Sequence, residues 1–104
     1  MRELTGDTFK DVISSGDVLM DFWAEWCGPC MMFGPIFEAA SKLHPGITFA
    51  KVNVDDESNK AIAAQYGIRS IPAILAFRGG ELLAARSGAM DPAALENFIK
   101  ETFN

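Results

Sequence analysis

The residues of this chain whose type and spacing could do chemistry are Cys27 and Cys30, its only cysteines. They stand in the stretch Trp26-Cys27-Gly28-Pro29-Cys30, where an apolar run gives way to a helical pattern. At this separation on a helix the two Cβ atoms lie about 5–6 Å apart, so a slight adjustment lets a disulfide form. The pair therefore points to thiol–disulfide exchange.

The predicted helix makes the two thiols unequal. Cys27 stands at its N-terminus, where unpaired N–H groups and the helix dipole favour a negative charge, so its thiolate should be stabilised. Cys30 begins the apolar stripe of the helix and should be shielded. Pro29 fits the first turn, where its missing N–H costs little. This pattern predicts an exposed nucleophile, Cys27, followed by a buried resolving thiol, Cys30.

The composition narrows the possible classes of function. The chain has 104 residues, 49% of them hydrophobic, which predicts a single domain over residues 1–104 with its own core. A net charge of -5 disfavours nucleic acid, and no apolar run approaches the ~20 residues of a membrane-spanning helix. The N-terminal residues lack a signal-peptide pattern, so we expect a cytoplasmic protein in a reducing compartment.

Two other interpretations of the cysteines are weaker. A structural disulfide is disfavoured by the expected reducing compartment. A zinc site needs about four ligands, and two cysteines with the lone His44 supply too few, so we expect no metal. His44 is more simply a residue at a helix end, beside a turn. The acidic run Asp55-Asp56-Glu57 lacks the ligand spacing of a calcium loop and is expected to be a solvated loop.

The strands that would position the cysteines follow from the hydropathy pattern. Residues 18–24 form an unbroken apolar run between turn residues, which is typical of a central strand covered on both faces. Alternation predicts a further strand over residues 47–54, and residues 2–4 could form a short first strand. Residues 73–77 and 81–85 flank a short Gly-Gly connection, which predicts an antiparallel hairpin.

Helices are expected in the segments between these strands. The first follows Thr5 as N-cap, and the last follows Asp91-Pro92. The third is expected from Asn59 to Tyr66, with Gly67 as its C-terminal cap. The second begins at the cysteines and should kink at Pro35. Its apolar stripe consists of Cys30, Phe33, Ile36, Phe37, Ala40 and Leu43. The order βαβαβαββα predicts an α/β fold, with one mixed sheet of about five strands flanked by four helices.

Two charged residues do not fit the strands that hold them. Asp21 interrupts the apolar run of the central strand, and alternation places Lys51 on the same face as the apolar Ile47 and Phe49. Buried charges are normally paired, so a satisfied structural pair is one interpretation. A functional pair is the other, because perturbed acids and bases gather at active sites.

The stretch from Asp21 to Cys30 resembles the signature of the thioredoxin family. The resemblance continues through residues 49–55, 66–72 and 77–80 to Gly88, and so covers essentially the whole chain in order. It implies the thioredoxin fold and a redox-active disulfide between Cys27 and Cys30. It also implies that Cys27 is the attacking thiolate and Cys30 the resolving thiol.

The resemblance assigns roles to the two misplaced charges. Asp21 matches a buried acid thought to take the proton of the resolving thiol, and Lys51 matches its buried partner. Burial raises a carboxyl pKa and a nearby ammonium opposes this, so a carboxyl tuned near the working pH is a useful general base.

A substrate-binding surface is also implied by the resemblance. From the residues alone a trans peptide bond before Pro72 is favoured, since about 5–6% of X-Pro bonds are cis; the resemblance implies a cis bond. The backbone of Ile71 would then pair with an extended substrate segment. The implied substrate-binding residues are Trp26, Gly28, Pro29, Ile71, Pro72, Gly88 and Ala89. The sequence departs from the family pattern at Met31, Ala73 and Ser87.

The function expected from these features is reduction of protein disulfides in electron transport and cell redox homeostasis. The resemblance implies thioredoxin reductase, a flavin enzyme driven by NADPH, as a partner, and disulfide-containing proteins as substrates. The chain itself is expected to need no cofactor and to be a monomer. A thiol oxidase or isomerase, and a non-catalytic binding module with the same fold, are the alternatives.

Overall fold

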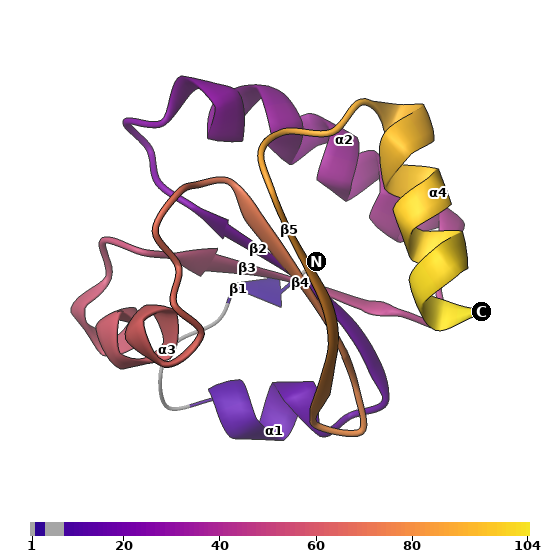
Figure 1. Ribbon diagram of the computed structural model, residues 1–104, viewed down its shortest axis with the longest axis horizontal. Helices are drawn as coiled ribbons and strands as arrows, with labels where there is room; N and C mark the ends of the chain where they lie inside the picture. Colours follow the sequence, from indigo (N-terminus) through magenta and orange to yellow (C-terminus); the bar gives the residue numbers. More distant parts are fainter. Residues whose placement is uncertain (1, 4–7) are drawn as a thin grey trace.

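The computed structural model describes residues 2–3 and 8–104, which contain a five-stranded sheet of order β1-β3-β2-β4-β5 (Figure 1). The central strand is β2 (Asp17–Trp23). It pairs in parallel with β3 (Thr48–Asn53) and antiparallel with β4 (Ala73–Arg78). The edges of the sheet are β1 (Arg2–Glu3), parallel to β3, and β5 (Glu81–Ser87), antiparallel to β4. The predicted mixed sheet is confirmed.

The apolar run of β2 explains its central place. Its five inner residues, 18–22, are all fully buried, and their side chains alternate between two cores. Val18, Met20 and Phe22 enter one hydrophobic cluster, and Leu19 enters another. The strand is therefore covered on both faces, as its continuous hydropathy predicted.

Four helices cover the sheet, two on each face (Figure 1). α2 (Gly28–Leu43) and α4 (Pro92–Phe103) pack on the face that carries Leu19. α1 (Phe9–Ile13) and α3 (Lys60–Gln65) pack on the other, with a short 3-10 turn, η1 (Glu57–Asn59), before α3. α4 starts where predicted, because the Asp91 carboxylate accepts the Ala94 backbone N–H at 2.7 Å.

The hairpin between β4 and β5 is also confirmed. Gly79 and Gly80 join the strands with φ angles of 59° and 87°, a conformation that side chains with a Cβ disfavour. The resulting antiparallel pairing runs from Arg78 opposite Glu81 to Ala73 opposite Ser87. It fixes the start of β4 at residue 73, directly after Pro72.

Some sequence-based expectations need correction or stay open. Leu43 is 70% exposed and does not belong to the buried stripe of α2, which ends at Ala40. Leu43 is the last helical residue and lines an open hollow between α2 and α4 instead of packing into the core. Helix α2 continues through Pro35, and the kink expected there stays a prediction. The expected strand residue Leu4 and the expected N-cap Thr5 lie outside the described residues. Across the described residues, no helix has both the length and the apolar character required to cross a membrane.

Candidate redox site

The two cysteines form a disulfide at the N-terminus of α2, with their Cα atoms 5.2 Å apart. Cys27 is the N-cap residue, and its Sγ accepts the backbone N–H of Cys30 at 3.2 Å. Gly28 and Pro29 fill the first turn between them, and both are exposed. A thiolate at Cys27 would therefore lie against an N–H donor and the positive end of the helix dipole.

The expected difference in exposure between the two cysteines is wrong. Cys27 is 5% exposed and Cys30 is 2% exposed, so both are buried. Sequence alone placed Cys27 outward because it stands at a helix end. In the fold, however, Cys27 and Cys30 pack with Ala24 in a small cluster that Ile71 also contacts. What distinguishes the two cysteines is the position of Cys27 at the N-cap rather than its accessibility.

The loop before β4 lies against Cys27. The Cys27 Sγ is 3.7 Å from the carbonyl oxygen of Ile71, and the Ile71–Pro72 peptide bond is cis. The Pro72 carbonyl oxygen accepts the backbone N–H of Gly88 at 2.8 Å, which joins this loop to the end of β5. Ala89 follows Gly88 and is exposed. The loop before β4 thus contacts Cys27 on one side and the residue after β5 on the other.

Trp26 lies beside the cysteines with 71% of its surface exposed. Its indole Nε1 donates a hydrogen bond to the Asp55 carboxylate at 2.8 Å. Sequence reasoning missed this role for Asp55, which it placed in a solvated loop. The parallel pairing of β2 and β3 supplies the missing signal, because it places Trp23 beside Asn53 and so brings the two following loops to one edge of the sheet.

Asp21 and Lys51 lie on the sheet face that α2 covers. They are direct neighbours in the parallel register of β2 and β3. Asp21 is fully buried and Lys51 is partly buried. The Lys51 Nζ lies 4.2 Å from the ring centroid of Trp23, which packs against the cysteine cluster. Trp23 is therefore a site residue that sequence reasoning missed, because a tryptophan in an apolar strand looks like an ordinary core residue.

Two carboxylates outside this group have a lowered pKa, and both serve the scaffold. The Arg78 guanidinium lowers the pKa of Asp17, mainly through hydrogen bonds of 2.7 and 3.1 Å. The positive charge of Arg78 lowers it further. The hydroxyl and backbone N–H of Ser58 lower the pKa of Asp56, which caps η1. The acidic run is therefore in part a helix-capping loop.

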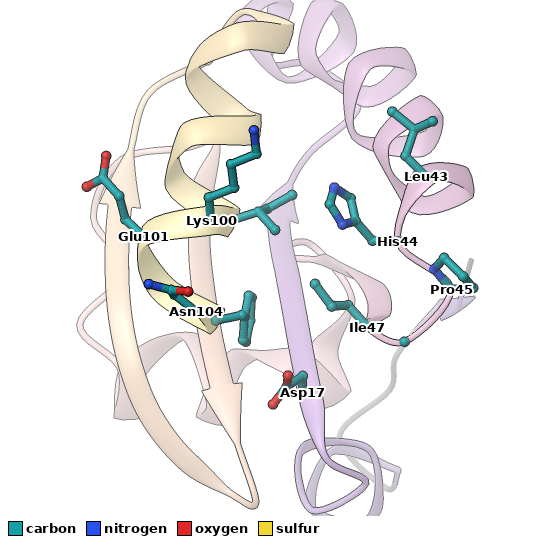
Figure 2. A pocket seen from close by; sticks show the side chains of 11 residues that line it. Asp17, Leu43, His44, Pro45, Ile47, Lys100, Glu101 and Asn104 are labelled. Carbon is teal, nitrogen blue, oxygen red and sulfur yellow. The ribbon is translucent and has the colours of Figure 1, made fainter.

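A hollow of about 740 Å³ lies at the other end of α2 (Figure 2). His44 and Ile47 point into it, between the C-terminal ends of α2 and α4. His44 is the C-cap of α2, as predicted, and its Nε2 lies 2.7 Å from a carboxylate oxygen of Glu96. Because the 16 residues of α2 span roughly 24 Å, this hollow is remote from the disulfide.

Comparison with known proteins gives the same result as the geometry. The family model described as Thioredoxin matches residues 1–101. "Putative thioredoxin 2" of Streptomyces coelicolor is 42% identical over 98 residues, which cover 93% of this chain and 72% of that protein. A "Thioredoxin" of Haemophilus influenzae is 42% identical over 96 residues, 89% of this chain and 88% of the relative. "Thioredoxin M-type, chloroplastic" of Chlamydomonas reinhardtii is 41% identical over 101 residues, 94% of this chain and 71% of that protein. The chain therefore belongs to the thioredoxin family and is a thiol–disulfide oxidoreductase with Cys27 and Cys30 as its redox-active pair.

Proposed function

We propose that this oxidoreductase works as a reductant of protein disulfides, with Cys27 as nucleophile and Cys30 as resolving thiol. The observation that carries this assignment is the hydrogen bond from the Cys30 backbone N–H to the Cys27 Sγ at the N-cap of α2. A helix N-terminus stabilises negative charge on the residue that caps it, so Cys27 is the cysteine whose thiolate the fold favours.

The reaction transfers two electrons in two exchange steps. The Cys27 thiolate attacks one sulfur of the substrate disulfide, forms a mixed disulfide and releases the other sulfur as a thiolate, which takes up a proton. The Cys30 thiol then loses its proton, and its thiolate attacks the Cys27 sulfur. This step forms the Cys27–Cys30 disulfide and releases the second substrate sulfur as a thiolate. The substrate is reduced and the cysteine pair is oxidised.

Asp21 accepts the proton of Cys30 in this proposal, and Lys51 influences the protonation of Asp21. Complete burial favours the neutral form of a carboxyl, which can then exchange a proton near neutral pH. Lys51 is the neighbour of Asp21 across the strands, and its positive charge favours the ionised form. The alternative is a purely structural pair, in which case removing either charge would change stability without changing the exchange rate.

The substrate segment lies along the loop before β4. The backbone of Ile71, whose carbonyl oxygen is 3.7 Å from Cys27 Sγ, pairs in this proposal with an extended chain that carries the disulfide. The exposed indole of Trp26 extends this surface on the other side of the cysteines. The remaining contacts come from Gly28, Pro29, Pro72, Gly88 and Ala89.

The cellular setting is part of the same proposal. Thioredoxin reductase, a flavin enzyme driven by NADPH, would restore the dithiol and couple this protein to electron transport and redox homeostasis. The protein acts in the cytoplasm as a single domain over residues 1–104 and as a monomer. The relatives include a chloroplastic protein as well as bacterial ones, so targeting to an organelle is the alternative location. Imaging of the full chain in its source cell would distinguish the two locations.

An equilibrium titration against reduced and oxidised glutathione tests the direction of the reaction. The proposal predicts a reduction potential well below the cytosolic glutathione poise, as a reductant requires. A potential well above it would identify a thiol oxidase instead. In single-turnover assays with a disulfide peptide, Cys27→Ser should abolish reduction. Unchanged turnover in that variant would overturn the role of Cys27, and no turnover by the unsubstituted protein would favour a binding module without this activity.

A further inference from the structure

Lys51 is held by an aromatic ring beneath the disulfide. Its Nζ lies 4.2 Å from the ring centroid of Trp23, well inside the ~6 Å range in which a cation is attracted to an indole face. Trp23 ends β2 two residues after Asp21, so both side chains lie on the same face of the sheet. The same ring packs against the cluster of Cys27 and Cys30. Trp23 therefore packs against the cysteine cluster and also contacts the cation.

The ammonium lies between the sheet and α2. A Cβ placed on Gly34 of α2 would be 3.9 Å from the Lys51 Nζ, so the charge lies directly under the helix. Lysine has a flexible four-carbon stem and a compact charge that can take many positions. A ring face that binds the ammonium selects one of these positions, next to the strand that carries Asp21.

The contact uses the face of Trp23 and not its polar atom. The Nε1 of Trp23 is buried and has no hydrogen-bond partner within the described part of the chain. The neighbouring Trp26, by contrast, donates its Nε1 hydrogen to Asp55. Hydrogen bonding therefore does not explain an indole at position 23, and a phenyl ring would keep the feature that contacts Lys51.

We propose that Trp23 is a positioning residue that holds the Lys51 ammonium in place and thereby sets the pH at which Asp21 exchanges its proton. This inference rests on the proposed roles of Asp21 and Lys51. Other titratable groups on this side include Cys27 and Cys30 when reduced. At the rim, Glu25, Asp55 and Asp56 line a hollow beside Trp26. The flanking elements present Phe33 and Gly34 from α2 and Ile74 from β4.

The expected effect is a shift of the pH profile in a defined direction. Removing the ammonium disfavours the ionised carboxyl, so Lys51→Met should move the acid limb of the resolving step to higher pH. Trp23→Leu should move it the same way, by about 0.5 pH unit or more, because it releases Lys51. Trp23→Phe should keep most of the original profile. The double variant Trp23→Leu/Lys51→Met should match Lys51→Met alone.

The experiment measures single-turnover reduction of a synthetic disulfide peptide by the reduced full chain, from pH 5 to 9, with the products separated after acid quench. Tyr66→Leu is the matched control, because it removes an aromatic ring from the opposite sheet face, where Tyr66 packs on Phe9 and Phe77. Its profile should not move. NMR of the unsubstituted protein gives a second readout, since the Lys51 Hε protons should show an upfield ring-current shift that Trp23→Leu abolishes.

The outcomes separate this inference from the proposed function. If Lys51→Met shifts the profile but Trp23→Leu does not, or if the two shifts add in the double variant, the positioning role of Trp23 is overturned and the role of Lys51 stands. If Lys51→Met leaves the profile unchanged, both are overturned. If Trp23→Leu does not fold, the NMR spectrum of the unsubstituted protein provides the test. Lys51 Hε protons at their random-coil chemical shifts would then overturn the inference.

Discussion

Reducing the Cys27–Cys30 disulfide should make the folded protein less stable by an amount set by the size of the loop it closes. The two cysteines are three residues apart, so the bond closes a loop of four residues. The loss of loop-closure entropy in the unfolded chain then gives about 2 kcal/mol at 25 °C. The helix N-terminus recovers part of this in the reduced form, because it stabilises a Cys27 thiolate by about 0.5 kcal/mol.

Thermodynamic linkage connects this stability difference to function. The net difference is about 1.5 kcal/mol in favour of the disulfide in the folded state, so folding lowers the reduction potential of the pair by about 30 mV. The fold thus makes the Cys27–Cys30 dithiol a stronger reductant than the same two cysteines in an unfolded chain. The loop-closure entropy of the Cys27–Cys30 disulfide therefore favours transfer of electrons from this dithiol to a substrate disulfide.

Urea unfolding of the oxidised protein and of the protein kept in dithiothreitol, both at pH 7, measures the difference. We expect nearly equal slopes, a lower midpoint for the reduced form, and a melting temperature lower by roughly 10 °C. The double variant Cys27→Ser/Cys30→Ser is the control, and dithiothreitol should not change its midpoint. A reduced form as stable as the oxidised one, or more stable, would refute the reasoning and favour a thiol oxidase, whose reduced state is the stabilised one.

Three further predictions concern single side chains. Asp21→Ala should raise the free energy of unfolding by about 1–3 kcal/mol, because Asp21 is a fully buried acid. The same variant should slow the resolving step. A variant that unfolds at lower urea concentration than wild type would contradict the predicted gain in stability. Asp17→Asn should lower stability at pH 7 by up to about 1 kcal/mol. Since Arg78 lowers the folded-state pKa of Asp17, the pair stabilises the fold above the ordinary Asp pKa of 3.8, and this contribution is lost as pH falls through the lowered value. Urea midpoints of wild type and variant should therefore converge in acid, and a constant gap would count against the pair. His44→Ala should cost about 1 kcal/mol by breaking the contact with Glu96, with unchanged exchange kinetics, and a slower exchange would show that the far end of α2 contributes to the chemistry.

The features that sequence could predict are those with local causes. The burial of β2 follows from its unbroken apolar run, and the hairpin follows from Gly79 and Gly80. The start of α4 follows from Asp91, whose carboxylate caps the helix at the predicted place. The redox pair follows from cysteine spacing alone. The cis bond before Pro72 did not follow from local preference and was expected through resemblance to a family.

The features that sequence could not predict depend on contacts between distant segments. Cys27 is buried rather than exposed because a loop 44 residues away lies against its sulfur. The bond from Trp26 to Asp55 spans 29 residues, and that from His44 to Glu96 spans 52. Such contacts depend on which loops the sheet order brings to one edge, and hydropathy patterns do not contain that information.

The central claim is that Cys27, at the helix N-cap, is the cysteine that attacks. Trapping the mixed disulfide tests it most directly, with the Cys30→Ser and Cys27→Ser variants incubated separately with one disulfide peptide at pH 7 and examined by non-reducing mass spectrometry. The account predicts that Cys30→Ser accumulates a covalent adduct on Cys27 and that Cys27→Ser accumulates little or none. A faster or larger adduct on Cys30 in the Cys27→Ser protein would contradict it.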